Sequence, residues 1–233
     1  YKAFNIHFRN MGYSFDLNTP KGMFKEIAFN QIGKHNIANA VCAIAMADQA
    51  GIPMESILKA LETFPGVYRR MNVFEWKNAL VIDDYAHHPT ELRKVLETLK
   101  ESFPDRKNCV IFQPHLFSRT QDFMEAFAQV LDQFDEIVLM DIYPAREEPI
   151  AGVSSDVLLD RLKNQNKRKI HPEAFQSTIV NSEADLVLIL GAGDIGNQIQ
   201  KLKKTAFYKY LPVQKFNLYG TILKFLRLYT QES

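Results

Sequence analysis

The stretch ALVIDDYAHHPTE, residues 79–91, passes from an unbroken apolar run through a polar turn into a helix start. A short apolar run that ends in turn residues is typical of a strand buried on both faces. Pro89 suits the first turn of a helix, because its missing N–H is not needed there. We therefore interpret residues 79–91 as a strand, a loop and the beginning of a helix in an α/β domain.

The same order of elements continues through most of the remaining chain. Helical patterns alternate with further apolar runs, which predicts a mostly parallel sheet with helices on both faces, because parallel neighbours need a crossover. The expected strands are 79–82, 109–112, 137–140 and 186–190, and the expected helices are about 90–101, 120–133, 154–163 and 194–204.

Residues 1–63 follow a different pattern. Alternating stretches within residues 1–30 predict short strands, and apolar residues at helical spacing then predict helices at about 37–48 and 53–63. The sequence Phe64-Pro65-Gly66-Val67 is the best candidate for a linker, because Pro and Gly interrupt both helices and strands. Residues 206–233 leave the alternating pattern. Within them, residues 218–228 have helical spacing and are predicted to pack on the body or at an interface.

Composition and charge limit the classes of protein to which the chain can belong. The 233 residues are 46% hydrophobic and 24% charged, and a formal net charge of +1 argues against a nucleic-acid or membrane-binding surface. Cys42 and Cys109 lie in apolar stretches and are expected to be buried and free, and the first residues do not have the pattern of a secretory signal. We expect a cytoplasmic protein without a transmembrane segment. Because the chain begins with Tyr1 in a strand-like pattern, we also expect a fragment of a longer protein.

Polar, turn-rich loops follow the four expected strands of the α/β part, at residues 83–91, 113–120, 141–148 and 191–194. In open parallel sheets the carboxyl ends of the strands share one edge, and ligands bind there. The sequence therefore predicts a binding site at this edge. The glycines at 191 and 193 are better explained by a tight strand-to-helix turn than by a dinucleotide loop, because they follow the last strand.

Several side chains in these loops have two possible interpretations. The Asp83–Asp84 pair can accept hydrogen bonds from a ribose, or it can cap backbone groups. The His87–His88 pair can be surface residues or, together with His115, metal ligands, although the spacing of a zinc site is absent. Arg119 lies near a helix start, where a cation is mildly unfavourable, and this indicates an anionic partner.

Other candidate ligand contacts lie in or near the first unit. His35, Asn36 and Asn39 are three or four residues apart at the start of a helix, so they can share a face. A carboxamide pair can read an adenine edge because it offers both donor and acceptor, whereas Asn36 alone can be a helix cap. The Arg69–Arg70 pair, just past the linker, would suit a phosphate in a cleft between domains, although surface arginines are common.

Six motifs resemble those of the Mur ligase family, and within it those of the UDP-N-acetylmuramate–L-alanine ligases. The resemblance covers roughly residues 1–204, and its motifs at 83–89 and 112–115 are highly specific. Related murein-peptide ligases usually have EPR where this chain has QPH. The motifs are GxHNxxN at 33–39, FxGVxRR at 64–70, DDYAHHPTE at 83–91, FQPHxxSRT at 112–120, YxAxExPIxGVS at 143–154 and GAGDI at 191–195.

The resemblance implies the carboxy-terminal part of a three-domain, ATP-dependent ligase. Residues 1–65 would be the end of a central ATPase domain and residues 66–205 a Rossmann-like domain, with a tail of unknown role at 206–233. ATP would phosphorylate the carboxylate of UDP-N-acetylmuramate, and the amine of L-alanine would attack the acyl phosphate.

The resemblance also implies which residues contact the substrates. Leu116 stands where some family members carry a second Arg. The implied contacts are His35, Asn36 and Asn39 with adenine, Arg69 or Arg70 with the ATP phosphates, Asp83 or Asp84 with the ribose, and Tyr85, His87 and Arg119 with the amino-acid substrate.

No phosphate-binding loop of the form GxxxxGK[ST] occurs in the chain. The phosphate-binding lysine and the Mg²⁺ ligands of the intact enzyme are therefore expected outside it, and none of these residues is assigned a catalytic role. We expect the chain to be inactive alone. The alternatives are a murein-peptide ligase, a non-catalytic nucleotide-binding module and, more remotely, a metal-dependent hydrolase.

Overall fold

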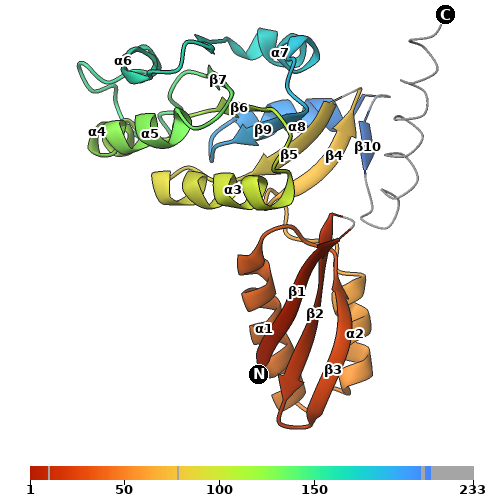
Figure 1. Ribbon diagram of the computed structural model, residues 1–233. Helices are drawn as coiled ribbons and strands as arrows, with labels where there is room; N and C mark the ends of the chain where they lie inside the picture. Colours follow the sequence, from red (N-terminus) through yellow and green to blue (C-terminus); the bar gives the residue numbers. More distant parts are fainter. Residues whose placement is uncertain (10, 78, 206–207, 211–233) are drawn as a thin grey trace, which may run out of the picture. The chain divides into compact units, whose positions relative to one another are not determined.

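The structure is a computed structural model that describes residues 1–9, 11–77, 79–205 and 208–210. The described chain forms two compact units, residues 1–67 and residues 68–210 (Figure 1). The helix predicted for residues 218–228 lies outside the described residues. The assignment of the first unit to the end of a central ATPase domain stays a prediction.

The second unit is built on the predicted parallel sheet. Its four expected strands pair in parallel in the order β5-β9-β6-β7, so β9 comes back to lie between β5 and β6. Apolar residues occupy both faces of these strands because helices cover both sides. The α/β fold predicted for this part of the chain is thus confirmed. The strands are β5 (Ala79–Asp84), β6 (Asn108–Phe112), β7 (Glu136–Leu139) and β9 (Leu186–Leu190).

Three strands that flank the four parallel strands were not predicted. β4 (Asn72–Trp76) pairs antiparallel with β5, and β10 (Tyr208–Tyr210) pairs antiparallel with β4. At the other edge, β8 (Lys167–Lys169) pairs in parallel with β7. β8 has the sequence KRK, which carries no apolar signal but does protect an edge from pairing with another chain.

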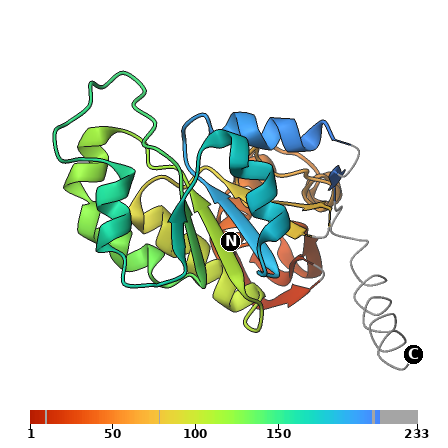
Figure 2. The ribbon, with the colours of Figure 1, turned by 90° about the horizontal axis from the view of Figure 1, so that it is seen from above.

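Helices lie on both faces of this sheet, as Figure 2 shows. Side chains of α7 and α8 enter the same apolar cluster as Phe74, Trp76 and alternate residues of the central strands. On the opposite face, α5 packs Phe127 against Phe112 of β6, and α3 lies beside α5. The helices are α3 (Pro89–Ser102), α4 (Phe117–Asp122), α5 (Met124–Leu131), α6 (Ser155–Arg161), α7 (Phe175–Asn181), which follows a 3₁₀ turn at Pro172–Ala174, and α8 (Ile195–Lys203).

The helix predicted for residues 120–133 is two helices, and α7 was not predicted at all. Phe123 interrupts the pattern between α4 and α5, with a φ of −115° and a ψ of 19°. Its ring packs edge-on against His88, at 4.5 Å between ring centroids. The break therefore coincides with a contact to a distant loop, which local sequence does not encode.

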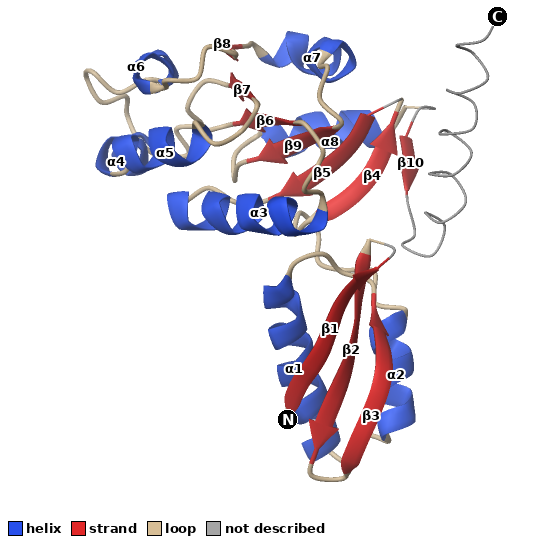
Figure 3. Ribbon diagram, in the orientation of Figure 1, coloured by secondary structure: helices blue, strands red, loops and turns tan. Residues whose placement is uncertain are grey.

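The first unit packs two helices against a three-stranded antiparallel sheet, coloured by element type in Figure 3. Alternate residues of β2 and β3 form its core with Ile37, Ala40 and Ile44 of α1 and Ile57 of α2. The strands and both helices agree with the sequence analysis. They are β1 (Lys2–Arg9), β2 (Gly12–Thr19), β3 (Gly22–Phe29), α1 (Lys34–Gln49) and α2 (Met54–Glu62).

Two expectations about the chain as a whole can be compared with the structure. Both cysteines are free, but only Cys109 is buried, so the expectation of a buried Cys42 is wrong. Cys42 lies on a part of α1 that faces away from the core of the first unit. None of the helices in the described ranges combines the length and apolarity that a membrane span requires.

Candidate functional site

Aromatic and imidazole rings from three strand-end loops meet at the carboxyl edge of the sheet. The ring centroids of Tyr85 and His87 are 5.4 Å apart, and those of His87 and His115 are 5.9 Å apart. His115 in turn stacks on Tyr143, at 5.6 Å and an interplanar angle of 25°. These four residues form what we call the four-ring cluster. The predicted site residues Tyr85 and His87 thus lie beside His115 and Tyr143, which the sequence analysis did not assign to the substrate.

Arg119 joins this cluster from the start of α4, in the segment that follows β6. One of its terminal nitrogens lies 3.3 Å from Nδ1 of His115 and 3.5 Å from the His115 carbonyl. Arginine only donates, so Nδ1 of His115 must accept and the imidazole carries its proton on Nε2. Burial, followed by Arg119 and His87, lowers the pKa of His115 below its ordinary value, whereas Glu147 opposes the shift. His115 is therefore a neutral ring that presents an Nε2–H donor.

Glu147 connects the loop after β7 to the beginning of α4. Its carboxylate accepts from the Ser118 hydroxyl at 2.5 Å and from the Ser118 backbone N–H at 2.9 Å. These two hydrogen bonds lower the pKa of Glu147, so it carries a negative charge near Arg119. The short helix α4, and with it Arg119, is thereby held against the neighbouring loop.

Leu116 has a backbone conformation that L-residues rarely adopt, with a φ of 73° and a ψ of 134°. Such a conformation costs on the order of 1–3 kcal/mol and persists where the surroundings hold it. The Leu116 N–H donates to the Tyr143 carbonyl at 2.9 Å, and its carbonyl accepts from Thr120 through both the backbone N–H and the hydroxyl. Strain is therefore located between His115 and Arg119, where the loop turns into α4.

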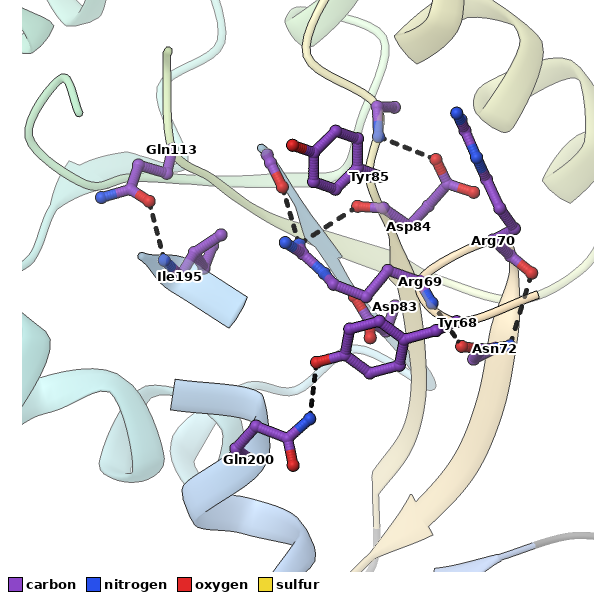
Figure 4. Close-up of polar contacts among 12 residues, drawn as sticks. Tyr68, Arg69, Arg70, Asn72, Asp83, Asp84, Tyr85, Gln113, Ile195 and Gln200 are labelled. Atoms are coloured by element: carbon purple, nitrogen blue, oxygen red, sulfur yellow. Dashed lines mark hydrogen bonds and ion pairs between the residues drawn. The ribbon is translucent and has the colours of Figure 1, made fainter. Parts of the chain in front are cut away.

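The Arg69–Asp83 pair lies inside the second unit (Figure 4). Arg69 is only 4% exposed; its Nε donates to Asp83 Oδ1 at 2.9 Å and a terminal nitrogen donates to the Gly191 carbonyl at 2.7 Å. Burial raises the pKa of Asp83, and the Arg69 guanidinium opposes part of that rise. The second Asp83 oxygen has no hydrogen-bond partner among the residues that the structure describes. Arg69 thus ties the beginning of this unit to the loop after β9.

Asp84 is also turned toward the protein. Its carboxylate accepts from the backbone N–H groups of Met71 and Ala86, at 2.9 and 2.8 Å, and burial raises its pKa. The predicted ribose contact of Asp83 or Asp84 stays a prediction, as does the phosphate contact of Arg69. Arg70 is the exposed member of the arginine pair, with its guanidinium 5.9 Å from the centre of the Tyr85 ring.

Gln113 joins the loops that follow β6 and β9, as Figure 4 shows for its contact with Ile195. Its Oε1 accepts from the Ile195 N–H at 2.8 Å, and its Nε2 donates to Asp194 at 2.6 Å. Gly191 has a φ of 142°, and a Cβ there would lie 2.7 Å from the Gln113 carbonyl. Glycine is therefore required at 191 both for its backbone conformation and for the close approach of these loops.

In the first unit, a cavity of about 450 Å³ lies between α1, α2 and the end of β3. Most of its lining is apolar, but the carboxamides of Gln31, Asn36 and Asn39 line it near the amino end of α1. Asn36 Nδ2 donates to the Ile32 carbonyl at 2.8 Å, and Asn39 Nδ2 lies 3.4 Å from Asn36 Oδ1. His35 is exposed and is not among the lining residues. Two of the three residues predicted to contact adenine, Asn36 and Asn39, thus line one cavity, and the carboxamide of Gln31 lines it as well.

The described part of the chain contains no group of three or more His, Cys, Asp and Glu side chains arranged to hold a metal ion. The alternative of a metal-dependent hydrolase built on Asp83, Asp84, His87, His88 and His115 therefore gains no support from the structure.

Comparison with known proteins gives consistent matches over most of the chain. The family described as Mur ligase, glutamate ligase domain, matches residues 69–193. UDP-N-acetylmuramate–L-alanine ligases of Flavobacterium johnsoniae and Flavobacterium psychrophilum are 46% and 48% identical, over 88% and 87% of this chain and 46% and 45% of their own lengths. The chain thus spans about half the length of the curated relatives it matches.

Solved structures show the same fold. A UDP-N-acetylmuramate–alanine ligase of Thermotoga maritima is 30% identical with a TM-score of 0.69, over 86% of this chain and 44% of that one. A folylpolyglutamate synthase of the same organism is 18% identical with a TM-score of 0.65, over 88% of this chain and 47% of that one, and shares the fold alone.

Proposed function

This chain belongs to the Mur ligase family, and from that premise we propose that it carries the amino-acid site of an ATP-dependent UDP-N-acetylmuramate–L-alanine ligase. The observation that carries the proposal is the meeting of His87, His115 and Arg119 at one sheet edge. The names of relatives that are 46% and 48% identical support the choice of substrates. Because those substrates belong to peptidoglycan precursor synthesis, we also propose a cytoplasmic location.

The chemistry of the four-ring cluster and Arg119 suits a small amino acid. The Arg119 guanidinium can hold a carboxylate with charge-assisted hydrogen bonds, and a fork of two such bonds also fixes its orientation. His115 adds a neutral Nε2–H donor beside it. His87 Nδ1 is already engaged, since it lies 2.9 Å from the Tyr85 carbonyl, so its Nε2 is the atom left to contact a ligand. We propose that Arg119 and the His115 Nε2–H bind the carboxylate of L-alanine, with the His87 ring beside them, and leave its amine free to react.

For the nucleotide, the proposal concerns each unit separately. In the first unit, the cavity between α1 and α2 offers an apolar surface with carboxamides at one end, which suits a purine ring. We propose that Asn36 and Asn39 contact adenine there, with the exposed His35 nearby. In the second unit, the exposed Arg70 is the better candidate for a phosphate, because Arg69 is committed to buried partners.

In the proposed reaction, ATP with Mg²⁺ supplies the phosphoryl group that converts the substrate carboxylate into an acyl phosphate. The amine of L-alanine then attacks that carbonyl, which forms the amide and releases phosphate. The contribution of this chain is to bind and orient the amino acid, so catalysis by these residues is a matter of position and charge. The Mg²⁺ ligands and the phosphate-binding lysine are expected outside this chain, since no GxxxxGK[ST] loop occurs in it.

We predict that the 233-residue chain alone releases no phosphate from ATP in the presence of UDP-N-acetylmuramate and L-alanine. Without a phosphate-binding loop it cannot position the γ-phosphate for transfer. A protein of the relatives' full length that contains this chain should release phosphate, and the release should depend on both substrates. A coupled phosphate assay measures both proteins under the same conditions.

The same assay distinguishes the proposal from its alternatives. If the full-length protein accepts a murein peptide in place of L-alanine, it is a murein-peptide ligase and our assignment of the amino acid is wrong. If it shows no ligation with either acceptor but binds ATP, the chain belongs to a non-catalytic nucleotide-binding module. Substrate-dependent phosphate release from the 233-residue chain alone would show that these residues contain a phosphate site that we have not identified.

A further inference from the structure

We propose that Tyr143 is a positioning residue that holds the His115 imidazole in place by filling the space between the loops that follow β6 and β9. Its benefit to amino-acid binding rests on the proposed function. The placement itself rests on contacts within the second unit alone. Nothing in the resemblance assigned Tyr143 a contact with a substrate.

The backbone of Tyr143 brackets His115 on both sides. The Tyr143 N–H donates to the Pro114 carbonyl at 2.9 Å, and the Tyr143 carbonyl accepts from the Leu116 N–H at 2.9 Å. Residues 115 and 143 therefore pair as a single parallel bridge beyond the ends of β6 and β7. The bond to Leu116 also helps to hold the strained conformation of that residue. His115 consequently sits on a fixed backbone rather than on a free loop.

The side chain of Tyr143 is confined between His115 and Gly193. Its ring stacks on the His115 imidazole. A Cβ added to Gly193 would lie 2.6 Å from Tyr143 Cβ, 2.7 Å from Tyr143 Cγ and 2.6 Å from Gln113 Oε1. Gly193 does not have a φ in the left-handed range, so glycine is needed here for space rather than for backbone conformation. Three loops that are far apart in the sequence thus meet at one aromatic ring.

This confinement matters because only one orientation of the His115 ring makes the observed contact with Arg119. Nδ1 faces the guanidinium of α4, which leaves Nε2–H as the donor. The other charged or titratable groups that act on the ring are His87 from the loop after β5 and Glu147 from the loop after β7. Without Tyr143 the imidazole would lose a covering surface and could rotate away from Arg119.

The test is an NMR titration of the His115 imidazole in the 233-residue chain, with Tyr143→Ala, Tyr143→Phe and Gly193→Ala. We expect the unaltered chain to show the Nε2–H tautomer and a pKa for His115 below its ordinary value. Tyr143→Phe is the matched control, because no hydrogen bond of the Tyr143 hydroxyl is found among the described residues, and it should leave both properties unchanged. Tyr143→Ala should raise the pKa of His115 toward the ordinary value and mix the two tautomers.

Gly193→Ala approaches Tyr143 from a different loop, so it also covers the case in which Tyr143→Ala does not fold. The new methyl group would lie too close to Tyr143 and to Gln113 Oε1. Displacement of Tyr143 should shift the His115 resonances in the same direction, although no contact of His115 is removed. If His115 keeps its tautomer and its pKa in every folded variant of Tyr143→Ala and Gly193→Ala, Tyr143 does not position it and the proposal is wrong.

Kinetics in a protein of the relatives' full length separate this proposal from the proposed function. Tyr143→Ala should raise the KM for L-alanine about tenfold, which corresponds to the loss of roughly one hydrogen bond, and leave the KM for ATP unchanged. If the His115 signals change while the KM for L-alanine does not, the positioning role of Tyr143 is supported and the proposed amino-acid site is not.

Discussion

Arg119→Ala is expected to raise the KM for L-alanine by about tenfold to a hundredfold, the equivalent of a charge-assisted hydrogen bond worth roughly 1.5–3 kcal/mol. The guanidinium is only partly exposed and lies against the His115 imidazole, so its attraction for a carboxylate is screened less than at an open surface. The variant also leaves Nδ1 of His115 without its donor. Steady-state kinetics in a protein of the relatives' full length would measure the effect, and the KM for ATP should change far less.

Two further variants make this result specific. Arg119→Lys keeps the positive charge but loses the planar fork, and we expect an intermediate rise in the KM for L-alanine. Arg93→Ala is the matched control, because it removes an exposed arginine from α3 in the same unit and should leave the KM for L-alanine unchanged. If Arg119→Ala raises the KM for ATP and leaves the KM for L-alanine unchanged, then Arg119 belongs to a phosphate site and our assignment is wrong.

The parallel core of the fold could be predicted because local sequence determines it. An unbroken apolar run predicts a strand between two helical layers whatever the rest of the chain does, and β5, β6, β7 and β9 all have such runs. The edge strand β8 has no apolar residue, and the break at Phe123 coincides with a ring contact with His88. Properties that arise only after the chain has folded were the ones that sequence patterns did not reveal.

The candidate site also combines features that local sequence predicts with features that arise only on folding. The positions of His87 and Arg119 at one edge follow from the rule for parallel strands, and the structure brings both to His115. Tyr143 was not identified, because its role depends on a stacking partner 28 positions earlier and on the absence of a side chain at Gly193. His115 had a signal, since it follows a strand as His87 does, but it was considered only as a metal ligand.

Polar residues at the strand ends were the hardest to interpret from sequence alone. A carboxylate or guanidinium at such a position looks the same whether it faces a ligand or the protein interior. Arg69, Asp83 and Asp84 prove to be buried, and their polar atoms mostly contact the protein. The Arg69–Asp83 pair is therefore expected to contribute to the stability of the second unit.

Arg69→Ala is expected to lower the free energy of unfolding of the chain by about 3–5 kcal/mol, the typical cost of removing one partner from a buried ion pair. Asp83 is fully buried, and its second carboxylate oxygen has no hydrogen-bond partner among the described residues. Without Arg69, only the weaker attraction of Lys203 would still favour its charge. The hydrogen bond to the Gly191 carbonyl would be lost as well. Urea unfolding measures the change, and Arg70→Ala, which removes the exposed neighbour, should change stability by less than about 1 kcal/mol.

The loss in Arg69→Ala should depend on pH, and the direction follows from the pKa of Asp83. Burial already raises that pKa in the folded chain, and removal of the opposing Arg69 charge would raise it further. A carboxyl group with a raised folded pKa binds more protons in the folded than in the unfolded state, so stability falls as pH rises from the unfolded toward the folded pKa. The free energy of unfolding of Arg69→Ala should therefore fall further below that of the unaltered chain at about pH 7 than at about pH 4. At the higher pH, adding Asp83→Asn to Arg69→Ala should restore part of the lost stability. An equal loss of stability at both pH values would mean that Arg69 stabilises the chain through its contact with Gly191 rather than by compensating the charge of Asp83.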